Sequence, residues 1–261
     1  MRVKPDADVE TLINQLQQHS RMFSDGYGNA NRAQWYANRV DDLEMICRNS
    51  MEDTELADGL LTDRYWHILQ NSVSDSVYGA GVFNQELKHQ AWRLDRARQQ
   101  LEAVRDCARA GEGTVIVPDT NVLVHGGELR SIDWKAAAGC EQVRIIVPLV
   151  VVAELDELKR TLRDKPDRLA IRTNIRQLKE ALHGVKPGDA ASLTEGVTIA
   201  VLPDPRGHRR LPVSDEEICD RASLLRSFTD PVLLATNDYN MHVTALGFAL
   251  DTIEVPEAAR P

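Results

Sequence analysis

VIVPDTNVLVH, at residues 115–125, contains the pattern that decides the fold. Three β-branched residues lead through a proline into Asp119, Thr120 and Asn121 follow, and a second apolar run begins behind them. β-Branched residues favour strands, and an uninterrupted apolar run is typical of a strand buried on both faces. A carboxylate placed where such a strand ends is either a turn former or helix cap, or a ligand.

The same pattern recurs through the second half of the chain. Short β-rich runs occupy residues 114–118, 144–148, 197–202, 232–236 and 250–255, and stretches with helical periodicity lie between them at 149–160, 167–183, 215–228 and 239–247. Strands that alternate with helices predict a doubly wound α/β layer, and the apolar character of the strands predicts parallel pairing.

The first part of the chain has a different character. Its periodicity predicts helices at 7–23, 29–50, 62–72 and 83–109, with a glycine-bearing break at 24–29. The glycine-rich AGEGT at 110–114 is the expected boundary between a helical N-terminal domain, 1–110, and an α/β domain, 111–261.

The helix expected at 83–109 is amphipathic. Its predicted apolar face consists of Phe83, Leu87, Ala91, Leu94, Leu101, Val104 and Ala108. We expect the N-terminal helices to mediate homo-oligomerisation or to dock a protein partner. The aromatic residues Trp35, Trp66 and Trp92 are expected to build a core there rather than to stack on bases.

Bulk composition narrows the class of protein. The 261 residues are 43% hydrophobic and 27% charged, which is ordinary globular composition. The net charge of −9 argues against a surface coated with basic residues, although a local basic patch remains compatible with it.

No apolar stretch approaches the roughly 18–20 residues of a membrane helix, and no secretory leader is expected. Four widely spaced cysteines without zinc spacing predict a reduced, cytoplasmic protein.

Four carboxylates follow apolar runs of the α/β part. Asp119 follows the first strand, Asp238 follows the fourth, Glu154 lies about one turn into the helix after the second, and Asp215 opens a later helix behind Ser214, the expected N-cap. Because the carboxyl ends of parallel strands meet at one edge of a sheet, we expect these carboxylates to share that edge.

Carboxylates that lie close together repel one another, and a hard divalent cation removes this difficulty. Mg²⁺ and Mn²⁺ prefer oxygen ligands and retain several waters, so either ion suits such a group. A bound ion can lower the pKa of a water molecule and stabilise charge on a phosphoryl oxygen. Thr120 and Asn121 are positioned to orient the Asp119 carboxylate or a bound water.

Four segments of the chain resemble, in order and rough spacing, the blocks of the PIN domain nucleases. These segments are VPDTNVLVH, VPLVVVAELDELKR, SDEEIC and LLATNDYNMHVTALGF, within about residues 114–256. The resemblance implies a five-stranded parallel sheet flanked by helices and metal-dependent hydrolysis of RNA phosphodiester bonds, which leaves 5′-phosphate and 3′-hydroxyl ends. The catalytic and metal-binding set that it implies is Asp119, Glu154, Asp215 and Asp238. Glu216 or Asp220 could replace or assist Asp215.

A nuclease also has to hold a polyanion. Residues 159–179 contain eight basic side chains against two acidic ones, and three arginines recur every four residues, so they form one stripe on a helix. The predicted substrate contacts are Lys159, Arg168, Arg172 and Arg176, together with Thr120, Asn121 and Asn237. The alternative is a solvated surface with helix pairs such as Arg176–Glu180.

A second basic segment, RGHRR at 206–210, is expected to form an exposed loop. His125 and His242 follow apolar positions and are expected to pack or cap, and neither is assigned as a general base.

The predicted function is that of a metal-dependent endoribonuclease acting on single-stranded RNA. The alternative is a catalytically silent PIN fold that binds RNA or protein. A phosphatase with Asp119 as phosphoryl acceptor is disfavoured because Asn121 stands where such enzymes place a second aspartate. A toxin of a toxin–antitoxin pair is disfavoured by the additional 110 residues.

Overall fold

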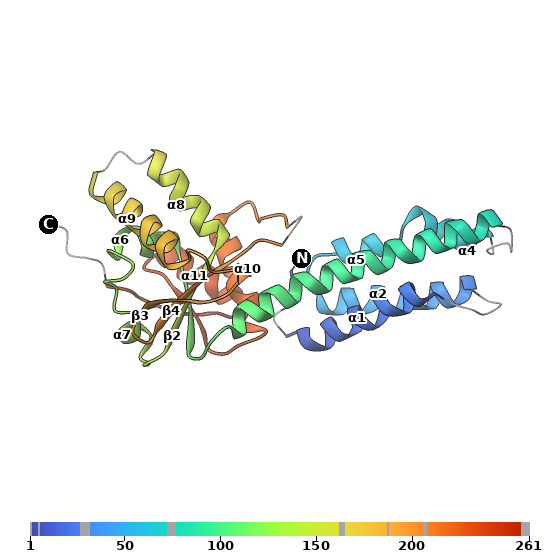
Figure 1. The fold of residues 1–261 in the computed structure, drawn as a ribbon, viewed down its shortest axis with the longest axis horizontal. Coiled ribbons are helices and arrows are strands. Elements are labelled where there is room, and N and C mark those ends of the chain that lie inside the picture. The colour runs from blue at the N-terminus through green and yellow to red at the C-terminus, as the bar shows by residue number, and fades with distance from the viewer. Residues whose placement is uncertain are drawn as a thin grey trace. The chain divides into compact units, whose positions relative to one another are not determined.

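The computed structural model describes residues 2–4, 6–26, 32–71, 77–161, 165–186, 188–205 and 208–256. The chain forms two compact units, Met1–Glu102 and Ala103–Pro261 (Figure 1). A helix continues across this division, so the domain boundary expected at 110–114 stays a prediction. No described helix has the length and apolarity needed to cross a membrane.

The first unit is helical. Its elements are α1 (Val9–Asp25), α2 (Arg32–Ser50), α3 (Glu55–Leu60), α4 (Asp63–Asn71) and α5 (Val77–Arg109), the last of which extends into the second unit. The helices expected at 7–23, 29–50, 62–72 and 83–109 correspond to α1, α2, α4 and α5, whereas the six-residue α3 was not predicted. The break expected at 24–29 begins at Gly26, which ends α1 with a positive φ, and residues 27–29 of it lie outside the described residues.

The core of this unit is aromatic and aliphatic. The rings of Phe23 and Phe83 each pack against Tyr36, with centroids 5.9 Å apart. Every residue of the predicted apolar face of α5 is buried. The prediction that the tryptophans build the core is wrong for Trp66 and Trp92, which are 49% and 57% exposed. The expected oligomer or partner contact through these helices stays a prediction.

The ring of Trp92 lies along its own helix instead of entering the core. The imidazole of His89 stacks on it, and the guanidinium of Arg96 lies 5.4 Å from its centroid. A tryptophan on an amphipathic helix can therefore be satisfied by the neighbouring turns, which composition does not reveal.

The second unit alternates strands and helices. Its elements are β1 (Thr114–Pro118), α6 (Thr120–His125), α7 (Trp134–Ala138), β2 (Val143–Pro148), α8 (Leu149–Thr161), α9 (Lys165–Ala181), β3 (Ala191–Thr194), β4 (Val197–Leu202), α10 (Ser214–Arg226), β5 (Val232–Ala235), α11 (Tyr239–Gly247) and β6 (Asp251–Ile253). All five predicted strands and all four predicted helices of this region are present. The short elements α6, α7 and β3 were not predicted.

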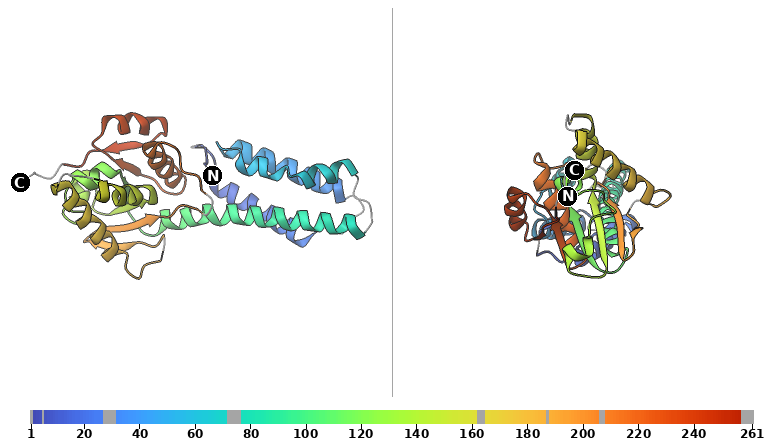
Figure 2. Two further views of the ribbon diagram at one scale, coloured as in Figure 1. Left: turned by 90° about the horizontal axis from the view of Figure 1, so that it is seen from above. Right: turned by 90° about the vertical axis from the view of Figure 1, so that its left-hand side faces the viewer.

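The strands form one sheet in the order β3-β4-β2-β1-β5-β6, with helices on both of its sides (Figure 2). The five predicted strands pair in parallel, and β3 adds a sixth, antiparallel edge strand next to β4. The chain proceeds from β1 to β2 and β4 on one side, then returns to place β5 on the other side of β1. This reversal of strand order lies between β1 and β5, where parallel sheets of this kind form a crevice.

Asn174 on α9 fixes the segment that follows β1 and α6. Its buried amide donates to the carbonyl oxygens of Leu123, at 2.6 Å, and Gly127, at 2.9 Å, and accepts from the backbone N–H of Leu129 at 2.7 Å. One side chain therefore satisfies three backbone groups where α6 ends and the chain turns. A buried backbone group without such a partner would be costly.

The substitution Asn174→Ala is expected to lower the free energy of unfolding by about 2–4 kcal/mol, because it leaves three backbone groups unpaired. Thr173→Ala, at the neighbouring position, should change it by less than about 0.5 kcal/mol. Urea unfolding followed by circular dichroism measures both. Equal stabilities of the two variants would show that Asn174 does not hold this segment.

Candidate active site

The site is organised around Asp119, the residue directly after β1. The residue is buried, with only 3% of its surface exposed. The carboxylate caps α6 by accepting the backbone N–H of Val122 at 2.7 Å. Pro118 pairs with Ala235 of β5 in the sheet, and the Asp119 N–H donates to the Ala235 carbonyl at 3.0 Å. The carboxylate is thus fixed by both the helix and the neighbouring strand.

Thr236, the residue after β5, links two of the predicted acids. Its hydroxyl donates to Asp119 Oδ2 at 2.5 Å and accepts the backbone N–H of Asp238 at 3.1 Å. The Asp238 carboxylate caps α11 by accepting the N–H of Asn240 at 2.8 Å, and the residue is exposed. Sequence reasoning missed Thr236, although its place at the end of a strand next to β1 was a usable signal.

Glu154 reaches this region from α8, which packs against α6 and α10. The Thr120 hydroxyl donates to a carboxylate oxygen of Glu154. Thr120 and Asn121, the two small polar residues after Asp119, have different environments. Thr120 is buried at the start of α6, whereas Asn121 is exposed on the same first turn.

Asp215 lies in the first turn of α10, half-buried. The prediction that Ser214 caps this helix is wrong: Ser214 is its first residue, and Val213 precedes it with an extended backbone and no side-chain cap. Burial raises the pKa of Asp215, the carboxylates of Asp238 and Glu154 raise it further, and a hydrogen bond with the Asn240 side chain opposes the change.

The pKa of Asp119 also reflects the nearby carboxylates of Asp215 and Asp238. Burial raises the pKa of Asp119 to about 6, and the negative charges of Asp215 and Asp238 contribute to the rise. The hydrogen bonds from Thr236 and Val122 act in the opposite direction. The four predicted acids are therefore electrostatically connected: Asp119 with two of them, and Asp215 also with Glu154.

The four carboxylates are neighbours, but they do not form a tight cluster. Within the described parts of the chain, no three of them offer oxygen atoms that all lie within 4.8 Å of one another. Each of the oxygen atoms of Asp119 is directed to a hydrogen-bond donor of the protein, and Glu154 is directed to Thr120.

The alternatives for the third acid occupy different environments. Glu216 is exposed, and Asp220 is buried. Burial lowers the pKa of Arg221, and the negative charge of Asp220 partly opposes this decrease. The charges that add most to the effect of burial on the pKa are those of Asp215 and Asp238 for Asp119, and those of Asp238 and Glu154 for Asp215.

Asn237 uses its amide within the protein. It donates to the Val255 carbonyl at 2.7 Å and accepts the Val255 N–H at 2.9 Å. This pair ties the segment between Thr236 and Asp238 to the chain after β6. Asn237 therefore fixes the position of the Asp238 backbone.

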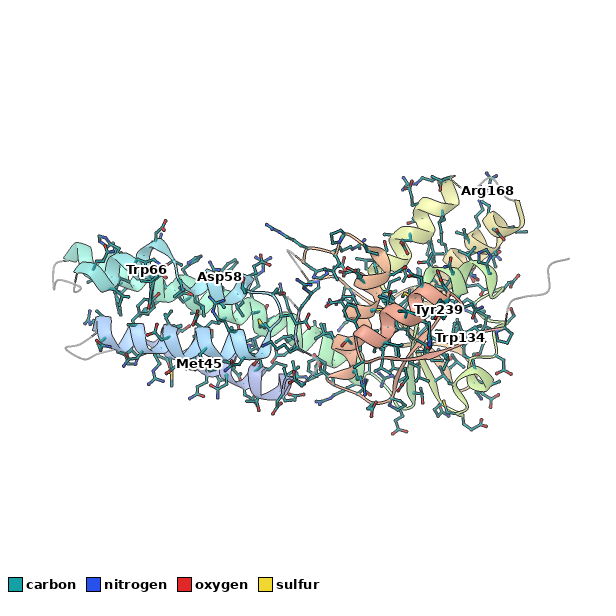
Figure 3. All side chains as sticks on the ribbon, turned by 180° about the vertical axis from the view of Figure 1, so that it is seen from behind. Met45, Asp58, Trp66, Trp134, Arg168 and Tyr239 are labelled. Atoms are coloured by element: carbon teal, nitrogen blue, oxygen red, sulfur yellow. The ribbon has the colours of Figure 1, made fainter. Side chains whose placement is uncertain are left out.

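The predicted basic stripe lies on α9. Arg168, labelled in Figure 3, is half-buried. Arg172 and Arg176 are exposed. The expected pair between Arg176 and Glu180 is present, with Nε and Oε1 3.8 Å apart. Lys159 is half-buried in the last turn of α8. Arg163 and Asp164, and the side chain of Lys165, lie outside the described residues.

The second basic segment is only partly exposed. Arg206 and Gly207 lie outside the described residues, and Arg209 is exposed as expected. The expectation is wrong for His208, whose side chain is buried and whose Nε2 lies 2.6 Å from Glu217 Oε1. The cause is a partner on α10 that the local sequence does not identify.

Glu217 belongs to a second polar group. Ligand atoms of Asp204, His208 and Glu217 all lie within 4.8 Å of one another, a spacing that could hold a cation. Arg210 pairs with Asp204 at 2.8 Å. Although burial opposes it, hydrogen bonds from His208 and the Leu211 N–H hold the pKa of Glu217 below its usual range. These hydrogen bonds fasten His208 and Leu211 to Glu217 of α10.

The two predicted histidines pack against neighbouring elements. His125 Nδ1 lies 3.7 Å from Asp167 Oδ1, and His242 Nδ1 lies 2.5 Å from the Thr252 hydroxyl. All four cysteines are free thiols.

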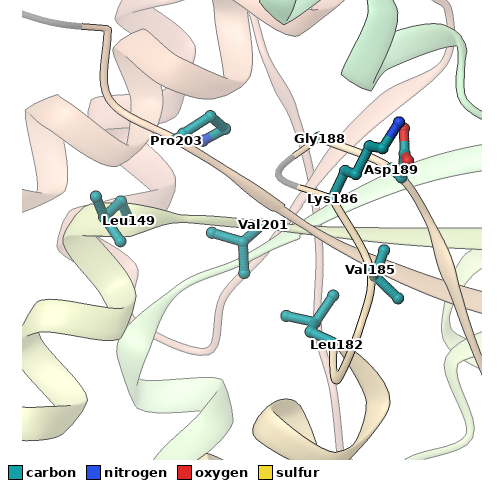
Figure 4. A pocket seen from close by; sticks show the side chains of 8 residues that line it. All are labelled: Leu149, Leu182, Val185, Lys186, Gly188, Asp189, Val201 and Pro203. Carbon is teal, nitrogen blue, oxygen red and sulfur yellow. The ribbon is translucent and has the colours of Figure 1, made fainter.

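A cavity of about 310 Å³ opens elsewhere in this unit (Figure 4). Its walls are mainly apolar, from Leu149, Leu182, Val185, Val201 and Pro203, with Lys186, Gly188 and Asp189 completing the lining. None of the four acids lines it, so the cavity is separate from the carboxylates at the strand ends.

The acidic set fits a hard divalent cation by its chemistry. Its donors are all carboxylate oxygens, which such ions prefer. Burial, and after it the neighbouring carboxylates, raise the pKa of Asp119 and of Asp215, and a positive charge would oppose both effects. Asp119, Glu154, Asp215 and Asp238 are the residues that would hold it.

Comparison with known families identifies the second unit. The family model described as PIN domain matches residues 116–255, more than half of the chain. The matched region begins in β1 and ends after β6, so it includes all four acids. The first 115 residues lie outside the match. No curated protein matches the chain.

In buffer without divalent cations, the contribution of Asp119 to folding stability is expected to be lost as the pH rises from about 4 to about 6. The folded-state pKa of Asp119, about 6, exceeds the ordinary 3.8, so the folded protein binds this proton more tightly than the unfolded chain does. The contribution is ~3 kcal/mol. Unfolding of the wild type and Asp119→Asn at stepped pH measures it, because the variant lacks the titrating group. Parallel pH profiles would contradict the expectation.

Thr236→Ala is expected to weaken Mn²⁺ binding about 10- to 100-fold, because the lost hydroxyl orients both Asp119 and the Asp238 backbone. Thr236→Ser keeps the hydroxyl and should bind almost as the wild type does. Isothermal titration calorimetry gives the affinities, and unfolding curves verify that both variants are folded. Equal affinities for the two variants would remove the orienting role.

Proposed function

The chain belongs to the PIN domain family through residues 116–255, and from this premise we propose that it is a metal-dependent endoribonuclease acting on single-stranded RNA. PIN domains are generally nucleases. The observation that carries the proposal for this chain is the placement of its acids: Asp119 and Asp238 follow the paired strands β1 and β5, and the Thr236 hydroxyl bridges them. Glu154 is held by Thr120, beside Asp119, and the charges of Asp238 and Glu154 add to the effect of burial on the pKa of Asp215.

The proposed metal ligands are these same four carboxylates, and the proposed ion is Mg²⁺ or Mn²⁺. When bound, such an ion supplies charge neutralisation at a phosphoryl oxygen and lowers the pKa of a coordinated water. Asp119 is the buried anchor of the set, and Asp238 is its exposed member, open to a substrate from solvent.

The surrounding polar residues orient the acids. Thr236 holds Asp119 and the Asp238 backbone, and Asn237 holds the same backbone through Val255. Thr120 directs Glu154. A carboxylate positioned in this way changes little when it binds its ligand, which favours both affinity and reaction.

Asp215 is the proposed third acid, rather than Glu216 or Asp220. Its pKa responds to Asp238 and Glu154, and its hydrogen bond with Asn240 joins the start of α10 to α11. The charge of Asp220 instead acts on Arg221 and Cys219.

Substrate contacts are proposed at two places. Asn121 is exposed on the first turn of α6, directly after Asp119, where its amide can donate to a phosphate oxygen. Lys159, Arg168, Arg172 and Arg176 are proposed to hold the strand through its phosphates, which gives affinity without sequence selection.

Purified full-length protein is expected to cleave labelled single-stranded RNA in Mg²⁺ or Mn²⁺. Chelation should stop cleavage, and Asp119→Asn should reduce it by at least about 100-fold, because the anchoring carboxylate is lost. Asp156→Asn removes an exposed carboxylate from α8 and should leave the rate unchanged.

Circular dichroism confirms that both variants are folded before rates are compared. Cleavage that survives chelation, or equal rates for the two variants, would contradict the proposal. If the wild type binds RNA in a gel shift but leaves it intact in Mn²⁺, the protein is an RNA-binding member of the family without nuclease activity.

A further inference from the structure

Tyr239 directly follows Asp238 and is 81% exposed, more than any other exposed large hydrophobic residue in the described chain. It is the first residue of α11 (Figure 3). An aromatic ring in this position leaves most of its apolar surface in water. Isolated exposed apolar residues are ordinary on protein surfaces, but this one is adjacent to a carboxylate of the proposed active site.

The backbone that carries Tyr239 is well fixed. Asp238 caps the helix through Asn240, and the Asp238 N–H is held by Thr236. Met241 and Ala245 bury the inner face of α11, so its outer face is left to solvent. Within the described residues, neither a ring contact nor a hydrogen bond engages the Tyr239 side chain.

The charges around the site limit how a nucleic acid can be held there. Four carboxylates repel a phosphate backbone, and α11 itself, YNMHVTALG, contains no lysine, arginine, aspartate or glutamate. Near the acids, the protein therefore has to bind the nucleic-acid strand through uncharged contacts, in addition to any bound cation. The flat face of a nucleobase offers such a contact, because every base can stack on an aromatic ring.

We propose that Tyr239 is a substrate-binding residue whose ring stacks on a nucleobase next to the phosphate held at the acidic site. The proposal rests on the nuclease function and adds to it a contact for the base rather than the phosphate. Stacking of this kind tolerates any sequence and requires an unpaired base, so it selects single-stranded over double-stranded RNA.

The outer face of α11 also presents Val243 and Leu246, one and two turns after Tyr239, and both are exposed. Such an apolar stripe is the kind of surface that a helix of a protein partner can contact. The base contact is favoured because the most exposed of the three residues is aromatic and adjoins Asp238. The protein contact is a distinguishable outcome of the test.

The test uses single-stranded RNA that carries the fluorescent base 2-aminopurine at successive positions, with Ca²⁺ as the cation. Binding to the wild type should quench the fluorescence at one position, because stacking quenches this base.

Tyr239→Phe keeps the ring and should behave as the wild type. Tyr239→Ala should abolish the quenching and weaken binding about 10-fold by fluorescence anisotropy. RNA with an abasic nucleotide at that position lacks the base that would stack on the ring. Tyr239→Phe and Tyr239→Ala should therefore bind this RNA equally.

Val243→Ala, one turn further along α11, is the matched control and should leave RNA binding and quenching unchanged. Equal binding and quenching for Tyr239→Ala and Tyr239→Phe would overturn the proposal. So would a change in oligomeric mass for both Tyr239→Ala and Val243→Ala with RNA binding intact, because the stripe would then contact protein.

Cleavage by the same proteins in Mn²⁺ separates this proposal from the proposed function. If Tyr239-dependent quenching occurs without cleavage by the wild type, the base contact stands and the nuclease function fails. If cleavage occurs with no difference between the Tyr239 variants in binding or quenching, the nuclease function stands and the base contact fails.

Discussion

Repulsion between carboxylates is the constraint on which the arrangement of the second unit depends. Asp119 is buried at the end of the central strand β1, where its own burial and the charges of Asp215 and Asp238 oppose ionisation. The protein offsets this cost with two hydrogen bonds, from Val122 and Thr236. Glu217, another buried acid of the unit, accepts hydrogen bonds from His208 and the Leu211 N–H, which hold its pKa below the usual range although burial opposes this. In the proposed function, a bound cation would relieve the repulsion among the acids at the strand ends.

The sheet order explains how four distant segments reach this region. Because β1 lies between β2 and β5, the residues after β1 and β5 become direct neighbours, and Thr236 can bridge Asp119 to Asp238. The helices after β2 and β4 bring Glu154 and Asp215. Asp119 and Asp238 are helix caps as well as proposed ligands. A carboxylate can cap a helix and also bind a cation, because the cap uses only one lone pair of one oxygen atom. The cap also fixes the orientation of the carboxylate.

Local sequence patterns predicted the five parallel strands, the main helices and the edge of the sheet that the acids share. They did not predict β3, because ASLT lacks the continuous apolar run of the other strands, or α6, because its six residues make fewer than two helical turns. Asn174 was missed for another reason: its partners are backbone groups about 50 residues away in the chain, which only the tertiary fold brings near. Thr236 was missed because its partner, Asp119, is 117 residues away, although its place at a strand end was a usable signal. The exposed Trp92 shows the same limit, because its partners are polar residues on its own helix.

Mn²⁺ binding to the full-length protein, followed by electron paramagnetic resonance, tests most directly whether the four acids share one cation. The wild type should bind Mn²⁺, and the single variants Asp119→Asn, Glu154→Gln, Asp215→Asn and Asp238→Asn should each weaken that binding at least about 10-fold. Glu217→Gln, in the separate group with Asp204 and His208, should leave it unchanged. Loss of binding in Glu217→Gln alone, with the other four variants unaffected, would contradict the account.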